Sequence, residues 1–251
     1  MKKKPLISIV ITYYKKKDFI KKTLESILNQ TYKNYEVIFV YDQEEKKDLE
    51  FIKKLLSKFK NIKLIVNKKN FGVSKSRNIA IKHVKGKYLA FIDSDDLWKK
   101  NKLMTQFNFM KKNHYLFSFT SYAEIDEKNK VIKERKVLFD PYYNNLYRSN
   151  FIGLSTVMVN EKIFSKIYFP NLKTQEDFAL WLKLLRQGIK IKCLNKTLSF
   201  WRKTKNSLSS NLYRKLIDAF KLYYFYEKKN FIISIFSVII LSCNKILKKF
   251  N

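Results

Sequence analysis

Hydrophobic residues in the first hundred positions alternate between short continuous runs and amphipathic stretches. Four of the runs have the length and composition of buried strands: LISIVI (6–11), EVIFV (36–40), IKLIV (62–66) and YLAFI (88–92). The stretches between them place apolar residues three or four positions apart, which predicts helices over 18–29, 47–59 and 74–85. This alternation predicts an α/β fold whose mainly parallel sheet is flanked by helices.

The pattern becomes looser after residue 115. Two further strands are predicted, in YLFSFTSYAEI (115–125) and FIGLSTVMV (151–159), and polar segments connect them. The segment EDFALWLKLLRQG (176–188) predicts a helix that ends at its glycine, and residues 211–228 predict another. We therefore expect a main domain over 1–211 and a C-terminal helical tail over 212–251.

The tail contains an uncharged apolar run, FIISIFSVIILSC (231–243), with lysines before and after it. The run is too short to cross a bilayer, which requires about 20 apolar residues. Its flanks are typical of a helix that lies in the interface of an anionic membrane, which would place the protein at the cytoplasmic face. A terminal helix packed on the main domain is the alternative, and the sequence leaves both open.

Composition adds a strong positive charge. The chain has 53 Lys and Arg residues against 21 Asp and Glu, a formal net charge of +32. Such a protein is attracted to nucleic acid, anionic lipid or phosphate-bearing substrates. The lysines are dispersed along the whole chain, whereas a nucleic-acid interface requires a clustered stripe. We therefore expect no nucleic-acid partner.

Cysteine and glycine usage excludes several kinds of site. The two cysteines, Cys193 and Cys243, form no CxxC pair, which is typical of a reducing compartment such as the cytoplasm, and we expect no disulfide. None of the four glycines lies in a G-x-G-x-x-G or a G-x-x-x-x-G-K motif. A dinucleotide-binding or P-loop site is therefore not expected.

Acidic residues follow the predicted strands at the edge where a ligand is expected. Asp42 follows the second strand and Asp93–Asp96 the fourth, and the carboxyl ends of parallel strands meet at one edge of a sheet. Carboxylates two positions apart, as in DSD (93–95), repel each other unless a cation or a ribose hydroxyl engages them. This pattern predicts Mg²⁺ or Mn²⁺ bridging to substrate phosphates. The alternative is an acidic turn that caps a helix beginning near Leu97.

Four segments, taken in order, resemble the successive motifs of the family-two glycosyltransferases, which are inverting nucleotide-sugar enzymes with the GT-A fold. The segments are SIVITYYKKKDFIKKTLESILNQTYKNYEVIFVYDQ (8–43), NFGVSKSRNIAIKHVKGKYLAFIDSDD (70–96), QEDFALWLKLLRQG (175–188) and LSFWRKTKNSLSSN (198–211). The resemblance covers roughly residues 6–211. It implies transfer of a sugar from a nucleotide donor, most readily a UDP-sugar, to a saccharide or lipid-linked acceptor in surface glycan synthesis.

The resemblance implies donor-binding roles for five residues. Thr12 and Tyr14 would line the nucleobase pocket, and Asp42 would accept a hydrogen bond from the base. Arg77 would lie near the base and the phosphates. Arg202 would face the diphosphate.

The resemblance also implies the reacting groups. Asp93 would hold the ribose hydroxyls, and Asp95 would hold the divalent metal ion. Asp177 would be the general base that deprotonates the acceptor hydroxyl, with Glu176 supporting it. Without the other motifs, the last two residues would be interpreted as an acidic pair at a helix N-terminus.

The chain departs from the family pattern in three places. Tyr41 stands where a second acidic residue is common, Gln43–Glu44 where Gly-Ser is common, and Thr204 where histidine is frequent. These departures leave the identity of the base open and argue against a histidine ligand for the metal. Two alternatives to a transferase are a basic nucleic-acid-binding protein and a non-catalytic, glycan-binding member of the same fold.

Overall fold

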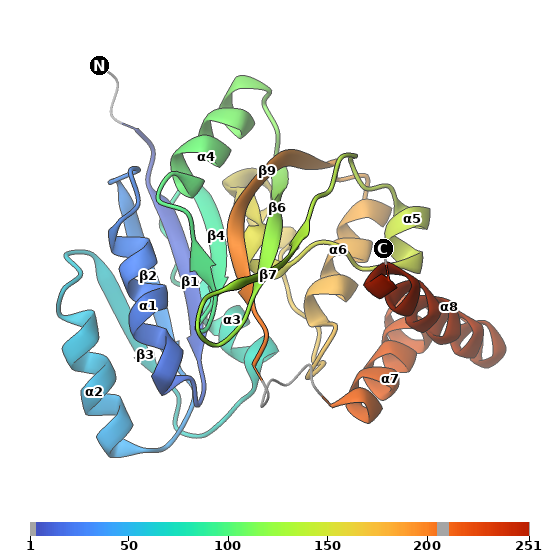
Figure 1. Cartoon of the computed structure of the whole chain (residues 1–251), viewed down its shortest axis with the longest axis horizontal. Helices are drawn as coiled ribbons and strands as arrows, with labels where there is room; N and C mark the ends of the chain where they lie inside the picture. Colours follow the sequence, from blue (N-terminus) through green and yellow to red (C-terminus); the bar gives the residue numbers. More distant parts are fainter. Residues whose placement is uncertain (1–3, 205–210, 251) are drawn as a thin grey trace.

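The computed structural model describes residues 4–204 and 211–250, and helices cover both faces of its nine-stranded sheet (Figure 1). The strand order is β3-β2-β1-β4-β8-β6-β9-β5, with β7 beside β6. Four parallel strands confirm the predicted runs: β1 (Ile7–Tyr13), β2 (Tyr35–Tyr41), β3 (Ile62–Val66) and β4 (Tyr88–Asp93). Their carboxyl ends therefore meet at one edge of the sheet.

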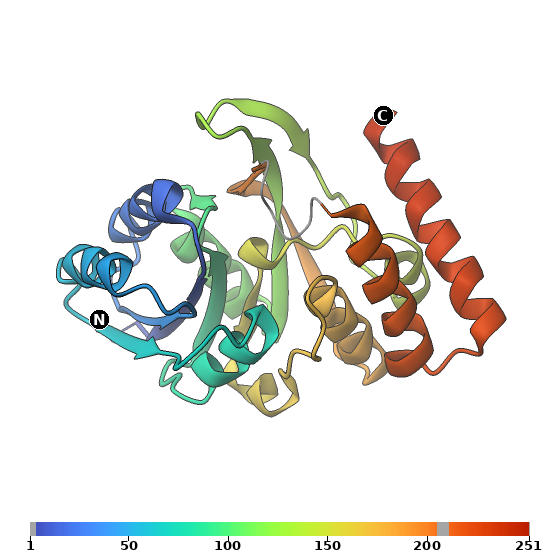
Figure 2. The same cartoon turned by 90° about the horizontal axis from the view of Figure 1, so that it is seen from below.

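Five helices pack on opposite faces of the sheet (Figure 2), and the first three of them connect the parallel strands. They are α1 (Lys17–Leu28), α2 (Lys46–Leu56), α3 (Val73–Ile81), α4 (Lys102–Lys112) and α6 (Glu176–Arg186). Because side chains alternate along a strand, β1 contributes to two cores. Ile9 and Ile11 pack with α1, α2 and α4, whereas Val10 packs with α3 and α6.

Helix α3 ends at Ile81, earlier than the predicted end at 85, because the chain turns back toward β1. A Cβ atom on Gly86 would lie 2.6 Å from the backbone nitrogen of Ser8. Only glycine allows the two backbones to approach this closely. The Ser8 hydroxyl accepts a hydrogen bond from the Gly86 N–H at 2.9 Å, which holds this corner.

The second half adds mainly antiparallel strands and short helices. Their bounds are β5 (Leu97–Trp98), β6 (Phe117–Ile125), β7 (Val131–Arg135), α5 (Tyr143–Arg148), β8 (Met158–Asn160) and β9 (Ile191–Arg202). Two 3₁₀ helices cover Leu154–Thr156 and Glu161–Lys166. Strands β6 and β9 run parallel to each other, and β8 joins β6 to β4.

Two sequence expectations in this region were wrong. FIGLSTVMV (151–159) is a strand only from Met158, because the Thr156 hydroxyl donates to the Gly153 carbonyl at 2.6 Å and closes a 3₁₀ turn. No helix begins near Leu97. Leu97 and Trp98 instead pair with Phe200 and Ser199 of β9, and α4 starts at Lys102.

The C-terminal tail folds into two helices that pack beside α5 and α6 (Figure 1). They are α7 (Leu212–Lys221), extended by a π-helical turn over Leu222–Tyr226, and α8 (Phe231–Phe250). Asp218 of α7 accepts two hydrogen bonds from Thr174, one from its N–H and one from its hydroxyl, both 2.9 Å long. The tail is therefore attached to the loop that precedes α6, and its treatment as a separate unit stays a prediction.

Candidate active site

The carboxyl edge of the sheet brings the first predicted site residues together. Thr12 is paired in register with Val40 of β2 on one side and with Asp93 of β4 on the other. The Asp93 N–H donates to the Ser155 hydroxyl at 3.0 Å, which fixes the end of β4. Asp93 keeps a side chain that is 34% exposed, so its carboxylate lines the rim and is available to a ligand.

Arg77 joins two of the predicted acidic residues across the rim. One terminal nitrogen of its guanidinium donates to Asp93 Oδ1 at 2.8 Å, and the other donates to Glu176 Oε1 at 2.5 Å. The Arg77 side chain is only 5% exposed, so both are charge-assisted hydrogen bonds shielded from water. The start of α3, the end of β4 and the start of α6 are thereby held together.

Glu176 and Asp177 occupy the first turn of α6, after Gln175 in a left-handed conformation with φ 65°. The Asp177 carboxylate accepts a hydrogen bond from the Phe178 N–H at 2.6 Å. Burial, and next the charge of Glu176, raises the pKa of the Asp177 carboxyl to about 7. A carboxylate with that pKa is suited to accept a proton near neutral pH.

Asp42 lies at the end of β2 and is buried. Its carboxylate accepts hydrogen bonds from the N–H groups of Phe71 and Gly72, at 2.8 and 2.9 Å, and from the Asn67 amide at 2.7 Å. These contacts hold the loop between β3 and α3 against β2. The hydrogen bond from a nucleobase to Asp42 stays a prediction, since both carboxylate oxygens already have donors.

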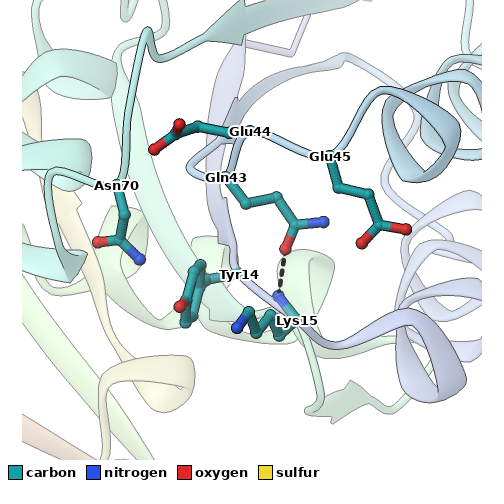
Figure 3. A pocket seen from close by; sticks show the side chains of 6 residues that line it. All are labelled: Tyr14, Lys15, Gln43, Glu44, Glu45 and Asn70. Carbon is teal, nitrogen blue, oxygen red and sulfur yellow. Dashed lines mark hydrogen bonds between the residues drawn. The ribbon is translucent and has the colours of Figure 1, made fainter.

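A pocket of about 240 Å³ opens next to Asp42 at the same edge (Figure 3). It is lined by Tyr14, Lys15, Gln43, Glu44, Glu45 and Asn70. The Tyr14 ring is 38% exposed, and the Lys15 ammonium lies 5.3 Å from its centroid. A flat aromatic ring beside polar amide and carboxylate groups can stack on and hydrogen-bond a planar base.

Gln43, one of the departures from the family pattern, lines this pocket and forms hydrogen bonds with neighbouring residues. Its side-chain oxygen accepts the Lys15 N–H at 2.8 Å (Figure 3), and its amide donates to Asp48 Oδ2 at 2.5 Å. Tyr41, another departure, is buried and stacks on Tyr13 with ring centroids 5.6 Å apart. It therefore packs in the core with α1 and α2 and does not line the pocket.

Asp95 lies against a lysine that the sequence did not single out. The Lys16 ammonium is 2.7 Å from Asp95 Oδ2 and also donates to the Thr204 hydroxyl at 3.0 Å. Thr204, the third departure, thus contacts the same cation as the predicted metal ligand. Asp95 and Lys16 have exposed fractions of 15% and 19%, so the pair is mostly shielded from water.

Asp96 is buried and has a supporting role in the acidic turn. Its carboxylate accepts the Ser155 hydroxyl at 2.6 Å and the Arg202 N–H at 2.9 Å. Burial raises the pKa of Asp96 well above its ordinary value, and the charges of Asp95 and Asp93 act in the same direction. The turn thereby connects β4 to β9 and to the 3₁₀ helix that contains Ser155.

Arg202 lies at the end of β9, with its guanidinium directed into the protein. It donates to the carbonyl oxygens of Asp95 at 2.7 Å and Asp126 at 2.9 Å, and to Asn129 Oδ1 at 2.7 Å. Arg202 therefore ties the acidic turn to the loop between β6 and β7. Its contact with a diphosphate stays a prediction.

A divalent cation fits the donor chemistry at Asp95. Burial raises the pKa of Asp95, the Lys16 ammonium opposes this rise and the charge of Asp93 adds to it, so a further cation next to Asp95 would stabilise its charged form. Among the residues that the structure describes, no three His, Cys, Asp or Glu side chains are grouped to hold a metal. A cation at Asp95 would complete its coordination with water and substrate phosphates, as Mg²⁺ commonly does.

Two contributors to the site were not found in the sequence. Lys16 is the middle of three consecutive lysines, and no pattern distinguishes it from its neighbours. Ser155 lies within a segment interpreted as a strand, yet it contacts Asp93 and Asp96. Gly153, two residues before Ser155, was the one available signal for a turn.

Comparison with known proteins identifies the family. The model for "Glycosyl transferase family 2" matches residues 8–169. The chain is 31% identical over 231 residues to the putative teichuronic acid biosynthesis glycosyltransferase TuaG of Bacillus subtilis, covering 91% of each chain. It is 36% identical over 217 residues to the UDP-Glc:alpha-D-GlcNAc-diphosphoundecaprenol beta-1,3-glucosyltransferase WfaP of Escherichia coli, covering 84% of this chain and 83% of the relative.

Solved structures show the same fold. TarS of S. aureus in complex with UDP-GlcNAc superimposes with a TM-score of 0.70 at 20% identity, covering 91% of this chain and 69% of TarS. The mannosyltransferase PcManGT of Pyrobaculum calidifontis, in complex with GDP-Man and Mn²⁺, also has a TM-score of 0.70, at 13% identity, covering 91% and 66%. These matches confirm the predicted GT-A fold. The family model and the named relatives favour a transferase over a nucleic-acid-binding protein. The chain belongs to glycosyl transferase family 2.

Proposed function

We propose that this protein transfers a sugar from a UDP-linked donor to a lipid-linked saccharide, with inversion at the anomeric carbon. The observation that carries the proposal is the Asp93–Arg77–Glu176 bridge, which places Asp177 beside the rim with a pKa of about 7. The relatives support the substrates, since TuaG is named for teichuronic acid biosynthesis and WfaP for UDP-glucose and a diphosphoundecaprenol acceptor.

In this mechanism Asp177 removes the proton from an acceptor hydroxyl as that oxygen attacks the anomeric carbon. A carboxylate on the face opposite the leaving diphosphate permits one displacement, so the configuration at that carbon inverts. Asp93 would accept hydrogen bonds from the ribose hydroxyls, with Arg77 holding its carboxylate in place. A divalent metal ion at Asp95 would neutralise negative charge on the diphosphate.

Nucleotide binding provides the first test. UDP with Mn²⁺ is expected to raise the melting temperature by roughly 5 °C at a hundredfold excess over Kd, because ligand binding stabilises the folded state. Asp95→Ala should remove the metal-dependent part of this shift. Asp18→Ala, on the exposed side of α1, should retain it. Identical shifts in the two variants, or no shift with any nucleoside diphosphate, would contradict the proposed donor site.

We further propose that α8 attaches the enzyme to the cytoplasmic face of an anionic membrane. Its polar residues Ser234 and Ser237 are buried against the protein, and the Ser237 hydroxyl is 2.6 Å from the Tyr147 hydroxyl. Its large apolar side chains point outward instead. Those at least 40% exposed are Phe231, Ile232, Ile233, Ile235, Phe236, Ile239, Ile240 and Leu247.

An apolar surface of this extent is unusual on a protein that stays in water. Tyr224 and Phe225 of the neighbouring π-helical turn extend it, and Lys221 and Lys228 of the same segment are exposed. No helix among the described residues is long and apolar enough to span a bilayer. Shallow insertion of α8, helped by the net charge of +32, accounts for both the outward isoleucines and the lysines.

Vesicle binding tests this attachment. Replacing Phe236 and Ile240 together by Glu should reduce co-sedimentation with phosphatidylglycerol vesicles by about tenfold, because both side chains lose their insertion into lipid. Ile132→Glu, an exposed apolar position on β7, should leave it unchanged. Equal sedimentation of both variants would refute the attachment. Conversion of a dimer to a monomer by the double substitution would instead identify a second copy as the partner of α8.

A further inference from the structure

The Lys16 ammonium lies where a cation at the acidic turn would be held. It is 2.7 Å from Asp95 Oδ2 and 3.0 Å from the Thr204 hydroxyl. The residue immediately precedes α1, and its carbonyl accepts the N–H groups of Phe19 and Ile20 at 3.1 and 3.0 Å. The backbone of Lys16 is therefore fixed by the start of the helix, while its flexible side chain reaches across to β4 and β9.

Lys16 is also the more adaptable of the two cations beside Asp95. Arg202, the other one, donates to three carbonyl oxygens and to Asn129 Oδ1 and so is committed to the protein itself. Lys16 has two oxygen partners, and its stem lies near the Phe19 ring, whose centroid is 6.0 Å from Nζ. A lysine on such a stem can exchange one oxygen ligand for another with small backbone movement.

We infer that Lys16 is the resident counter-ion of Asp95 and competes with a divalent metal ion for it until the donor diphosphate arrives. The inference rests on the proposed function. Without donor, the ammonium neutralises the carboxylate and weakens metal binding. A bound diphosphate offers Lys16 other anionic oxygens, which frees Asp95 to hold the metal. Metal and donor therefore bind together, and Lys16 contacts the leaving group.

Titration of the full chain with Mn²⁺ alone tests the competition, with free Mn²⁺ followed by its electron paramagnetic resonance signal. Lys16→Met is expected to lower the Kd for Mn²⁺ by about tenfold, because removing an adjacent positive charge strengthens cation binding. Lys17→Met is the matched control, since Lys17 is exposed and lies 5.2 Å from the Phe51 ring, away from Asp95. Its Kd should equal that of the unmodified protein.

Two further variants complete the test. The double variant Lys16→Met, Asp95→Asn should lose the gain in Mn²⁺ affinity that Lys16→Met alone produces. This loss would assign the bound Mn²⁺ to Asp95. Thr204→Val keeps the ion pair but removes one ligand of the ammonium, so it should strengthen Mn²⁺ binding by a smaller factor even if Lys16→Met fails to fold. Mn²⁺ affinity unchanged by both Lys16→Met and Thr204→Val would overturn the inference.

A second readout separates this inference from the proposed function. Lys16→Met should bind UDP without metal about fivefold more weakly than Lys17→Met, since it has lost one cation for the diphosphate. The Mn²⁺ titration contains no donor, so its result stands whether or not the protein transfers sugar. Failure of the unmodified protein to bind any nucleoside diphosphate would overturn the proposed function alone. Equal metal-free UDP affinity of the two variants would overturn the role of Lys16 at the diphosphate.

Discussion

Asp177→Asn is expected to reduce the rate of sugar transfer by about a hundredfold or more, the scale at which a general base contributes. The amide has nearly the shape of the carboxylate but cannot accept the acceptor proton. Binding of UDP, measured by calorimetry, should remain within about twofold, because the role proposed for Asp177 is toward the acceptor and not the donor. Turnover is measured with a panel of UDP-sugars and a lipid-linked acceptor.

The pH dependence of transfer is the control for this role. A base with a pKa of about 7 is unprotonated only above that pH, so kcat/KM should fall about tenfold per pH unit below 7 and level off above it. The residual activity of Asp177→Asn should lack this fall in kcat/KM below pH 7, the acidic limb of the profile. A variant that retains both the unmodified rate and the same limb would remove Asp177 from the reaction.

Arg77→Met should destabilise the protein by about 3–5 kcal/mol, more than the other substitutions, because it leaves the buried Glu176 carboxylate without its cation. Glu176 and Asp93 would lose the guanidinium that joins them. The free energy of unfolding in urea measures the effect. Arg148→Met, at an exposed position on α5, is the control and should change stability by less than about 0.5 kcal/mol. Equal losses in the two variants would show that the bridge contributes no net stability.

Arg77→Met should also shift the pKa of Asp177, the proposed general base. Arg77 lowers the pKa of Asp177, so its removal should raise that pKa and move the activity limb to higher pH. Arg77→Lys restores the positive charge but not the two donor nitrogens of the guanidinium. It should therefore recover part of the stability but not the contacts to both Asp93 and Glu176.

The fold could be predicted where the local pattern of apolar residues alone determines the structure. Strands β1, β2 and β4 are almost entirely buried, so their sequences are continuous apolar runs that the pattern identifies, and the half-buried edge strand β3 has a similar run. The second half was harder because its strands are paired out of sequence order. FIGLSTVMV has strand composition, yet a single side-chain hydrogen bond at Thr156 turns it into a 3₁₀ helix.

The sequence identified the acidic residues and, through the family resemblance, Arg77 and Arg202, but not the contacts that these cations make. Asp93 and Asp95 lie at the end of a strand and Asp177 at the start of a helix, and the sequence predicts both boundaries. The pairing of Arg77 with Glu176 joins residues 99 positions apart, and local patterns contain no information on such contacts. Lys16 is equally hidden, since three lysines in a row have the same propensities and only the tertiary fold selects the one beside Asp95.

The two hydrogen bonds from Thr174 to Asp218 have a consequence for the reach of the enzyme. Thr174 is three residues before the proposed base, and Asp218 lies on the helix that leads into α8. The helix proposed to face lipid and the carboxylate proposed to react are thus linked through these two hydrogen bonds. The fold would therefore fix the distance from the bilayer at which an acceptor hydroxyl can react. Glycans whose acceptor hydroxyl lies nearer to or farther from the lipid anchor would not be substrates.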